Sequence, residues 1–223
     1  MSLAGAQQSA QPHVSVVAGS IVAAFFGPWA NIARNAFADA INAQPQTEAL
    51  ALWAYQQAVD ATAAEWQRAE SACASQFDMW GQSSAEGACV FFSGTAIHCH
   101  WLGSTSVVQV RNRQLESQNS PHTAYHAMLS EGQQPTDDRY LRLQYRSFVH
   151  EQQIDSVAWA AVEGDRVFIL PGALRPSCLQ SIASVCSDSE SSITESVAKL
   201  LVDSGRPLVT TFVMSEYVSE SGR

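Results

Sequence analysis

Residues 88–116 read ACVFFSGTAIHCHWLGSTSVVQVRNRQLE, and this stretch decides the fold class. It contains four short runs in which apolar and other residues alternate, and the runs are joined by SGT, GS and RNR. Alternation with a period of two is typical of half-buried strands, and short connections with Gly or Asn are typical of hairpins. The stretch therefore predicts a meander of antiparallel strands.

The segments before this meander have the period of helices. From Pro28, apolar residues recur at intervals of three and four, which predicts a helix over residues 28–43 with one buried face. The same period predicts a longer helix over residues 48–74, and a short apolar run predicts a strand over 14–18. The order is therefore one strand, two helices and then several strands.

The second half of the chain adds both kinds of element. Ser192 and Glu195 form a capping box, which predicts a helix that ends at Gly205. The other elements that we expect are a helical segment at 120–129, strands at 154–161 and 166–170, and a closing strand near the C-terminus. Helices that pack on antiparallel sheets make the fold class α+β.

The composition limits the class of protein. A chain of 223 residues suits one domain, and 46% hydrophobic with 15% charged residues is unlike a disordered chain. The formal net charge is −9 and no basic run is present, so nucleic acid is not an expected partner. We expect one domain over residues 1–223, in which residues 1–12 are flexible or in part foreign to the native protein.

The lack of signal-peptide features and the spacing of the cysteines favour a cytoplasmic protein. The N-terminus lacks the features of a signal peptide, and glycines and a proline interrupt the apolar run at 14–30. We therefore expect no membrane association. The five cysteines are scattered and lack CxxC spacing, which favours reduced thiols over disulfides or a zinc ribbon.

Three potential metal ligands occur in a row at His98, Cys99 and His100. In a strand, the two histidines share one face and could begin a metal site, but no third ligand lies nearby in sequence. We interpret them as ordinary strand histidines, with a metal site as the alternative. A cysteine phosphatase loop is excluded because its pattern needs arginine where the chain has Thr105.

Local strings along the chain form a recognisable series. A strand-like run leads to Gly27 before the first helix, Gly103–Ser106 follows an apolar strand, and Gly-Asp-Arg at 164–166 begins another. Pro171–Leu174 follows that strand, and Asn119–His122 precedes Gly132 by ten residues or more. In order and spacing these strings resemble the metal-dependent protein phosphatase 2C family in its compact bacterial form. The resemblance implies a four-layer α/β/β/α sandwich of two antiparallel sheets flanked by helices.

The same resemblance shows what this chain lacks. The family binds two Mg²⁺ or Mn²⁺ ions through aspartates. The ions activate a water and clamp the phosphoryl group. The positions that match those aspartates lack carboxylates; they are Gly19, Ser104, Gly172 and Pro207. Adjacent dications need several anionic oxygens, so we expect no metal and no other cofactor.

Three functions remain open. The first is a pseudophosphatase, a catalytically inactive member that binds a protein partner, with a kinase or a phosphoprotein as candidates. The second is a divergent active serine/threonine phosphatase with a rebuilt metal site, and the third is a structural subunit of a larger assembly. The residual site under these hypotheses comprises His98, His100, His122 and Arg175. Trp101 and Trp29 are candidate interface anchors, with core packing as the alternative.

Overall fold

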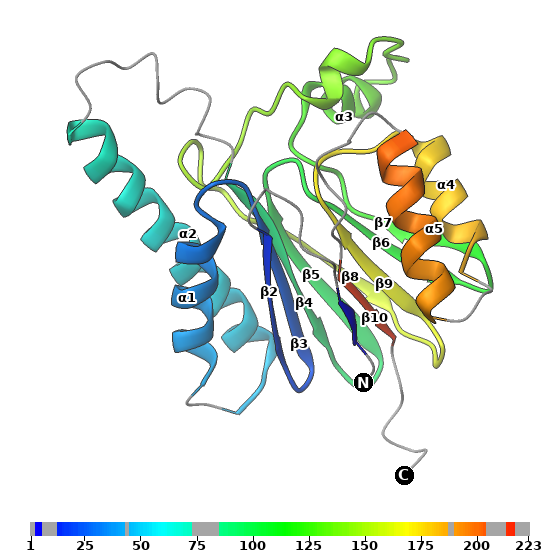
Figure 1. Cartoon of the computed structure of the whole chain (residues 1–223), viewed down its shortest axis with the longest axis horizontal. Coiled ribbons are helices and arrows are strands. Elements are labelled where there is room, and N and C mark those ends of the chain that lie inside the picture. Colours follow the sequence, from blue (N-terminus) through cyan, green and yellow to red (C-terminus); the bar gives the residue numbers. More distant parts are fainter. Residues whose placement is uncertain are drawn as a thin grey trace.

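The structure is a computed structural model that describes residues 3–5, 13–42, 45–72, 85–186, 190–203 and 213–216. Within these ranges, strands form two antiparallel sheets that lie face to face, and a pair of helices covers the outer face of each sheet (Figure 1). The α+β class and the four-layer sandwich with two antiparallel sheets are therefore confirmed. No helix in the described ranges is both long enough and apolar enough to cross a membrane.

The first sheet holds the beginning and the middle of the chain. Its strands, in spatial order, are β2 (His13–Ala18), β3 (Ile21–Phe26), β4 (Glu86–Phe92), β5 (Ala96–Leu102) and β8 (Asp155–Ala160). The helices α1 (Ala30–Ile41) and α2 (Glu48–Ala72) form an antiparallel pair on its outer face. The prediction that the first two helices pack on one sheet is thus confirmed.

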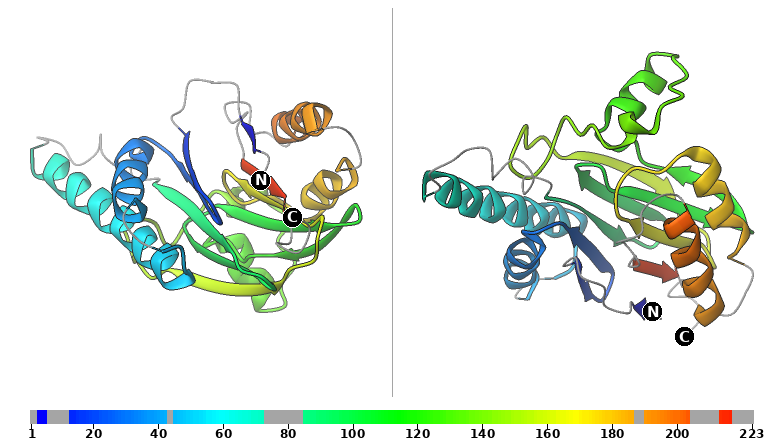
Figure 2. Two further views of the ribbon diagram at one scale, coloured as in Figure 1. Left: turned by 90° about the horizontal axis from the view of Figure 1, so that it is seen from below. Right: turned by 45° about the horizontal axis from the view of Figure 1, so that its top comes forward.

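The second sheet combines strands from both ends of the chain. Its spatial order is β1 (Leu3–Gly5), β10 (Val213–Glu216), β9 (Arg166–Leu170), β6 (Ser106–Arg111) and β7 (Gln114–Gln118). The helices α4 (Pro176–Ser184) and α5 (Glu190–Asp203) cover its outer face, as both views in Figure 2 show.

Alternation along the strands separates three apolar cores. In β3, Phe25 points to the helix pair α1 and α2, whereas Phe26 points to the space between the sheets. In β9, Ile169 joins the core between the sheets and Phe168 joins the core under α4 and α5. Because successive strand residues face opposite ways, each buried strand contributes to two layers.

A long connection between β7 and β8 lies outside the four layers. It contains α3 (Ala124–Ser130) and the short 3-10 helix η3 (Asp138–Leu141), which stand beyond one end of the sheets (Figure 1). Tyr125 and Leu141 form a small core there with Ala173, which follows β9. This connecting segment, residues 119–154, therefore covers one end of the sandwich.

The structure corrects several predicted elements. The sequence IVAAFF forms β3, which we did not predict because every residue is buried and the run shows no alternation. The short helix α4 and strand β1 were also not predicted. The helix expected to begin at the capping box begins earlier, at Glu190. Residues 6–12, Gly205 and the segment 217–223 lie outside the described residues, so the expectations for them remain predictions.

Candidate functional site

Strand ends from both sheets meet at one edge of the sandwich. In the first sheet, Phe26 at the end of β3 pairs with Glu86 at the start of β4, and Leu102 at the end of β5 pairs with Gly87. In the second sheet, the start of β6 pairs with Leu170 at the end of β9. We call the residues that lie at these strand ends the candidate site edge.

A carboxylate that we did not predict, Glu86, lies at the candidate site edge. Its Oε2 atom accepts a hydrogen bond of 2.8 Å from the backbone N–H of Ser104 and a second, short one from the Ser104 hydroxyl. Both residues are buried. The preceding Gly103 has φ +95°, and a Cβ there would lie 2.6 Å from the Cβ of Glu86, so the turn requires glycine.

His122 joins the connecting segment to the same turn. Its Nδ1 accepts a 3.1 Å hydrogen bond from the N–H of Gly103, so the ring proton lies on Nε2, which donates to Asp155 at 3.0 Å. Burial lowers the pKa of His122, although the hydrogen bond to Asp155 opposes this shift. The neutral ring also stacks on Trp101, and both of its nitrogens are engaged.

The end of β9 completes the candidate site edge. The hydroxyl of Ser106 donates a 2.9 Å hydrogen bond to the carbonyl of Gly172, which places this loop beside the start of β6. Gly172 has φ +72° and offers no side-chain oxygen. The residues at the ends of the three converging strands are therefore Phe26, Ser104 and Gly172.

The fold has close counterparts among solved structures. The Mycobacterium tuberculosis serine/threonine phosphatase PstP/Ppp matches with a TM-score of 0.71 and 16% identity over 96% of this chain and 98% of that chain. PppA of Pseudomonas aeruginosa, described as a key regulatory component of T6SS, matches with a TM-score of 0.68, 16% identity and the same coverage. Stp1 of Staphylococcus aureus, a serine/threonine phosphatase, has a TM-score of 0.69, 8% identity and 96% coverage of both chains.

The chain has the protein phosphatase 2C fold. No protein-family model matches the sequence, and no curated protein matches it. At 16% identity or less, this likeness shows a shared arrangement of helices and strands and does not show shared side chains at the site. Whether the phosphatase 2C chemistry is retained depends on the side chains at the candidate site edge.

The structure separates Gly19 from the candidate site edge. Gly19 lies in the turn between β2 and β3, and β3 runs for six residues, or roughly 20 Å, before it reaches Phe26. The prediction that Gly19 lies with Ser104 and Gly172 is therefore wrong. Pro207 lies outside the described residues, so its assignment stays a prediction.

His98 and His100 point away from the candidate site edge. They lie on the face of β5 that α2 covers, where His98 Nδ1 is 3.2 Å from Glu48 Oε1 and His100 Nδ1 is 2.7 Å from the hydroxyl of Ser156. Burial lowers the pKa of His100 to about 4. The expectation that both histidines lie beside the Ser104 turn is wrong, because Trp101, on the opposite face of β5, points between the sheets.

Arg175 and the two tryptophans have structural partners. The Arg175 guanidinium pairs with Asp138 and donates a 3.1 Å hydrogen bond to the carbonyl of Thr136, so it ties the start of α4 to the connecting segment. Trp101 is only 5% exposed, and its indole N–H donates to a backbone carbonyl at 3.0 Å. Trp29 packs against the core under α1. Trp101 therefore packs in the core between the sheets and is not accessible as an interface anchor.

The donor set at the candidate site edge does not fit a pair of Mg²⁺ or Mn²⁺ ions. These ions prefer several anionic oxygens, and two adjacent dications repel each other unless carboxylates offset their charge. The described part of the edge offers the carboxylates of Glu86 and Asp155. One oxygen of Glu86 already accepts two hydrogen bonds from Ser104, and Asp155, at the start of β8 beside the end of β5, accepts hydrogen bonds from His122 and Arg146. Across the described ranges, no three His, Cys, Asp or Glu side chains converge in a way that could hold a metal ion.

A test of the Glu86 contact follows from this geometry. Glu86→Gln should lower the free energy of unfolding by about 1–3 kcal/mol, because a neutral amide is a weaker acceptor for the buried N–H and hydroxyl of Ser104. Urea denaturation followed by circular dichroism measures this change. The matched control is Glu131→Gln at an exposed position, which should change stability by less than about 0.5 kcal/mol. Equal midpoints for both variants would contradict the assignment.

Proposed function

We propose that this chain is a catalytically inactive protein with the phosphatase 2C fold, which acts in the cytoplasm by binding a protein or phosphoprotein. The observation that carries the proposal is the composition of the candidate site edge. The strand ends that converge there carry an aromatic ring at Phe26, a neutral hydroxyl at Ser104 and no side chain at Gly172.

The chemistry of these three positions argues against phosphoryl transfer. Attack by a metal-activated water requires cations that neutralise the developing charge on the phosphoryl oxygens. Among the described residues of the edge, the carboxylates of Glu86 and Asp155 are already engaged, the first by Ser104 and the second by His122 and Arg146. Phe26 is 5% exposed within the core between the sheets. The Glu86 carboxylate instead accepts hydrogen bonds from the backbone N–H and the hydroxyl of Ser104.

A binding role is supported by the descriptions of proteins that share the fold. Two of them are described as serine/threonine phosphatases, and a third, PppA, is described as a key regulatory component of T6SS. A protein kinase or a phosphoprotein is therefore the class of partner that we propose. The alternatives are a divergent active phosphatase and a structural subunit, and each predicts a different result below.

The proposal predicts no metal-dependent phosphatase activity. With millimolar Mn²⁺ or Mg²⁺, we expect hydrolysis of p-nitrophenyl phosphate and of phosphothreonine peptides at the rate of a protein-free blank, because the carboxylate set is missing. PstP of Mycobacterium tuberculosis, assayed alongside, is the positive control. Turnover by this chain that requires metal and is lost in Glu86→Gln would instead establish a divergent enzyme.

A second measurement separates binding from a structural role. The chain should bind a phosphopeptide or a kinase domain in isothermal titration calorimetry as a separate folded protein. If it binds neither and is recovered from its source cells only within a stoichiometric assembly, the structural-subunit alternative is favoured and the binding proposal is wrong.

A further inference from the structure

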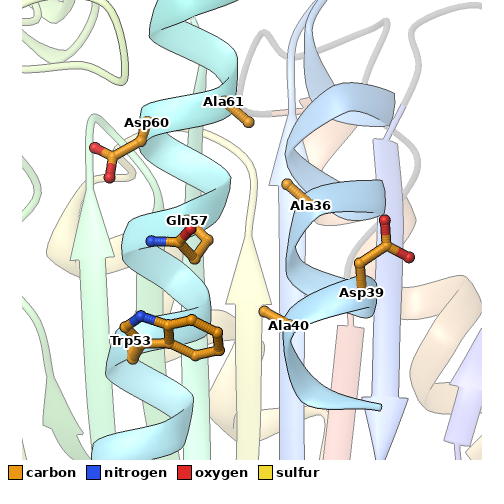
Figure 3. Close-up of a pocket in the computed structure, with 7 residues that line it drawn as sticks. All are labelled: Ala36, Asp39, Ala40, Trp53, Gln57, Asp60 and Ala61. Atoms are coloured by element: carbon orange, nitrogen blue, oxygen red, sulfur yellow. The ribbon is translucent and has the colours of Figure 1, made fainter. Parts of the chain in front are cut away.

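A groove of about 560 Å³ runs between α1 and α2 on the side away from the sheet. Figure 3 shows that its walls are two facing rows of side chains, one from each helix. The facing positions include Ala36 and Ala40 on α1 and Ala61 on α2. Methyl side chains are too short to fill the valley between two helices, so the groove results from the sequence itself.

One end of the groove carries an exposed aromatic side chain. Trp53 is 47% exposed, and in Figure 3 its indole extends from α2 toward Ala40 of α1. The neighbouring Leu52 is also 37% exposed. Tryptophans that become buried when a complex forms are frequent energetic anchors of interfaces. An exposed indole at the end of a groove therefore favours a bound partner.

The charge of the groove specifies the chemistry of that partner. Asp39 of α1 and Asp60 of α2 stand on its two outer rims, as Figure 3 shows, and none of the described residues that line it is Lys or Arg. Asp60 is held in place by a 2.8 Å hydrogen bond from Gln56. An indole face and carboxylates together attract arginine and lysine side chains through cation–π and ionic contacts.

We infer that this groove binds a basic peptide segment of a partner protein, with an arginine or lysine on Trp53 and at the acidic rims, and small apolar residues against the alanines. A second copy of this chain is a poor occupant because its net charge is −9. The groove lies on the opposite side of the first sheet's helix layer from the candidate site edge, and the inference does not depend on whether the chain is catalytically inactive.

The inference is tested by direct peptide binding. The probe is a fluorescein-labelled peptide of about 15 residues, built from Arg, Leu and Ala with helical spacing, and the control probe has Glu at every Arg position. In fluorescence anisotropy, we expect saturable binding of the basic probe, weakening of that binding as salt rises, and no binding of the acidic probe.

Variants locate the bound peptide. The double variant Asp39→Asn, Asp60→Asn and the single variant Trp53→Ala should each weaken binding at least about tenfold. The matched control is Glu131→Gln, Glu151→Gln, which removes the same charge from exposed positions outside the groove and should leave binding unchanged.

Either of two results would overturn the inference. One is equal binding of the basic probe to the groove variants and to the charge-matched control, which would mean that net charge alone attracts the peptide. The other is concentration-dependent self-association that Trp53→Ala abolishes, which would show that a second copy occupies the groove. Circular dichroism of each variant confirms folding, and since the phosphatase assay uses neither probe, failure here is distinguishable from failure of the proposed function.

Discussion

Replacement of Phe25 by alanine is expected to lower the free energy of unfolding by about 3–5 kcal/mol. The Phe25 side chain is fully buried under α1 and α2, and its ring contacts Phe37, Tyr55 and Phe148 at centroid distances of 5.6, 6.0 and 6.2 Å. Truncation removes these contacts and leaves a cavity that three rings from three different segments cannot close.

The measurement is urea denaturation followed by circular dichroism, with thermal unfolding as a second probe. A loss of this size is a large part of the stability of about 5–15 kcal/mol that is usual for a domain, so Phe25→Leu serves as a milder second variant, expected to cost about 1.5 kcal/mol. Leu143→Ala is the control, because Leu143 is 55% exposed and its truncation should have little effect. Equal denaturation midpoints for Phe25→Ala and this control would show that the first helix pair is not packed as described.

Asp165→Asn is expected to lower stability by about 3 kcal/mol, toward the lower end of the range for breaking a buried ion pair. The Asp165 carboxylate is fully buried and accepts hydrogen bonds from Arg111 at 2.8 and 2.9 Å, from Gln109 at 2.7 Å and from the N–H of Val162 at 2.8 Å. The effect is at the lower end because the Arg111 side chain is 25% exposed and stays partly hydrated.

The same carboxylate predicts a pH dependence. Burial alone would raise the pKa of Asp165, but the hydrogen bonds from Arg111, Val162 and Gln109 outweigh it and hold the pKa below its ordinary value of 3.8. Its contribution to stability is therefore complete above pH 3.8 and is lost as the pH falls through the folded-state pKa. Asp165→Asn should flatten the acid limb of a stability–pH curve, whereas the exposed Asp39→Asn should retain it; parallel acid limbs would contradict this prediction.

The layers of the fold were predictable because periodicity reports which face of each element is buried. The strands at 155–160 and 166–170 and the two long helices match their predicted ranges within a few residues. IVAAFF was missed because a strand that is buried on both faces shows no alternation, and without that strand Gly19 was assigned to the wrong end of it.

The positions of candidate site residues were predictable only where a residue lies at the end of a strand that the sequence pattern indicates. Ser104 and Gly172 lie at strand ends, as their strings indicated, and they come together at the same edge. Glu86 was missed because its role depends on pairing with β3 and β5, although a lone acidic residue directly before an apolar strand was an available signal. The layer that His98 and His100 face was not predictable from their own strand, because it depends on α2, a distant segment of the chain that packs on β5.

The pairing of β1 with β10 has a consequence for how the protein folds during synthesis. Leu3 lies opposite Ser215 in the second sheet, and β10 in turn joins β9. A ribosome that translates this chain releases every strand of the first sheet before it makes β10, so that sheet can form with α1 and α2 while β9 still lacks one neighbour. Contacts between such distant segments slow folding, and β1 cannot form its pairing with β10 until β10 emerges.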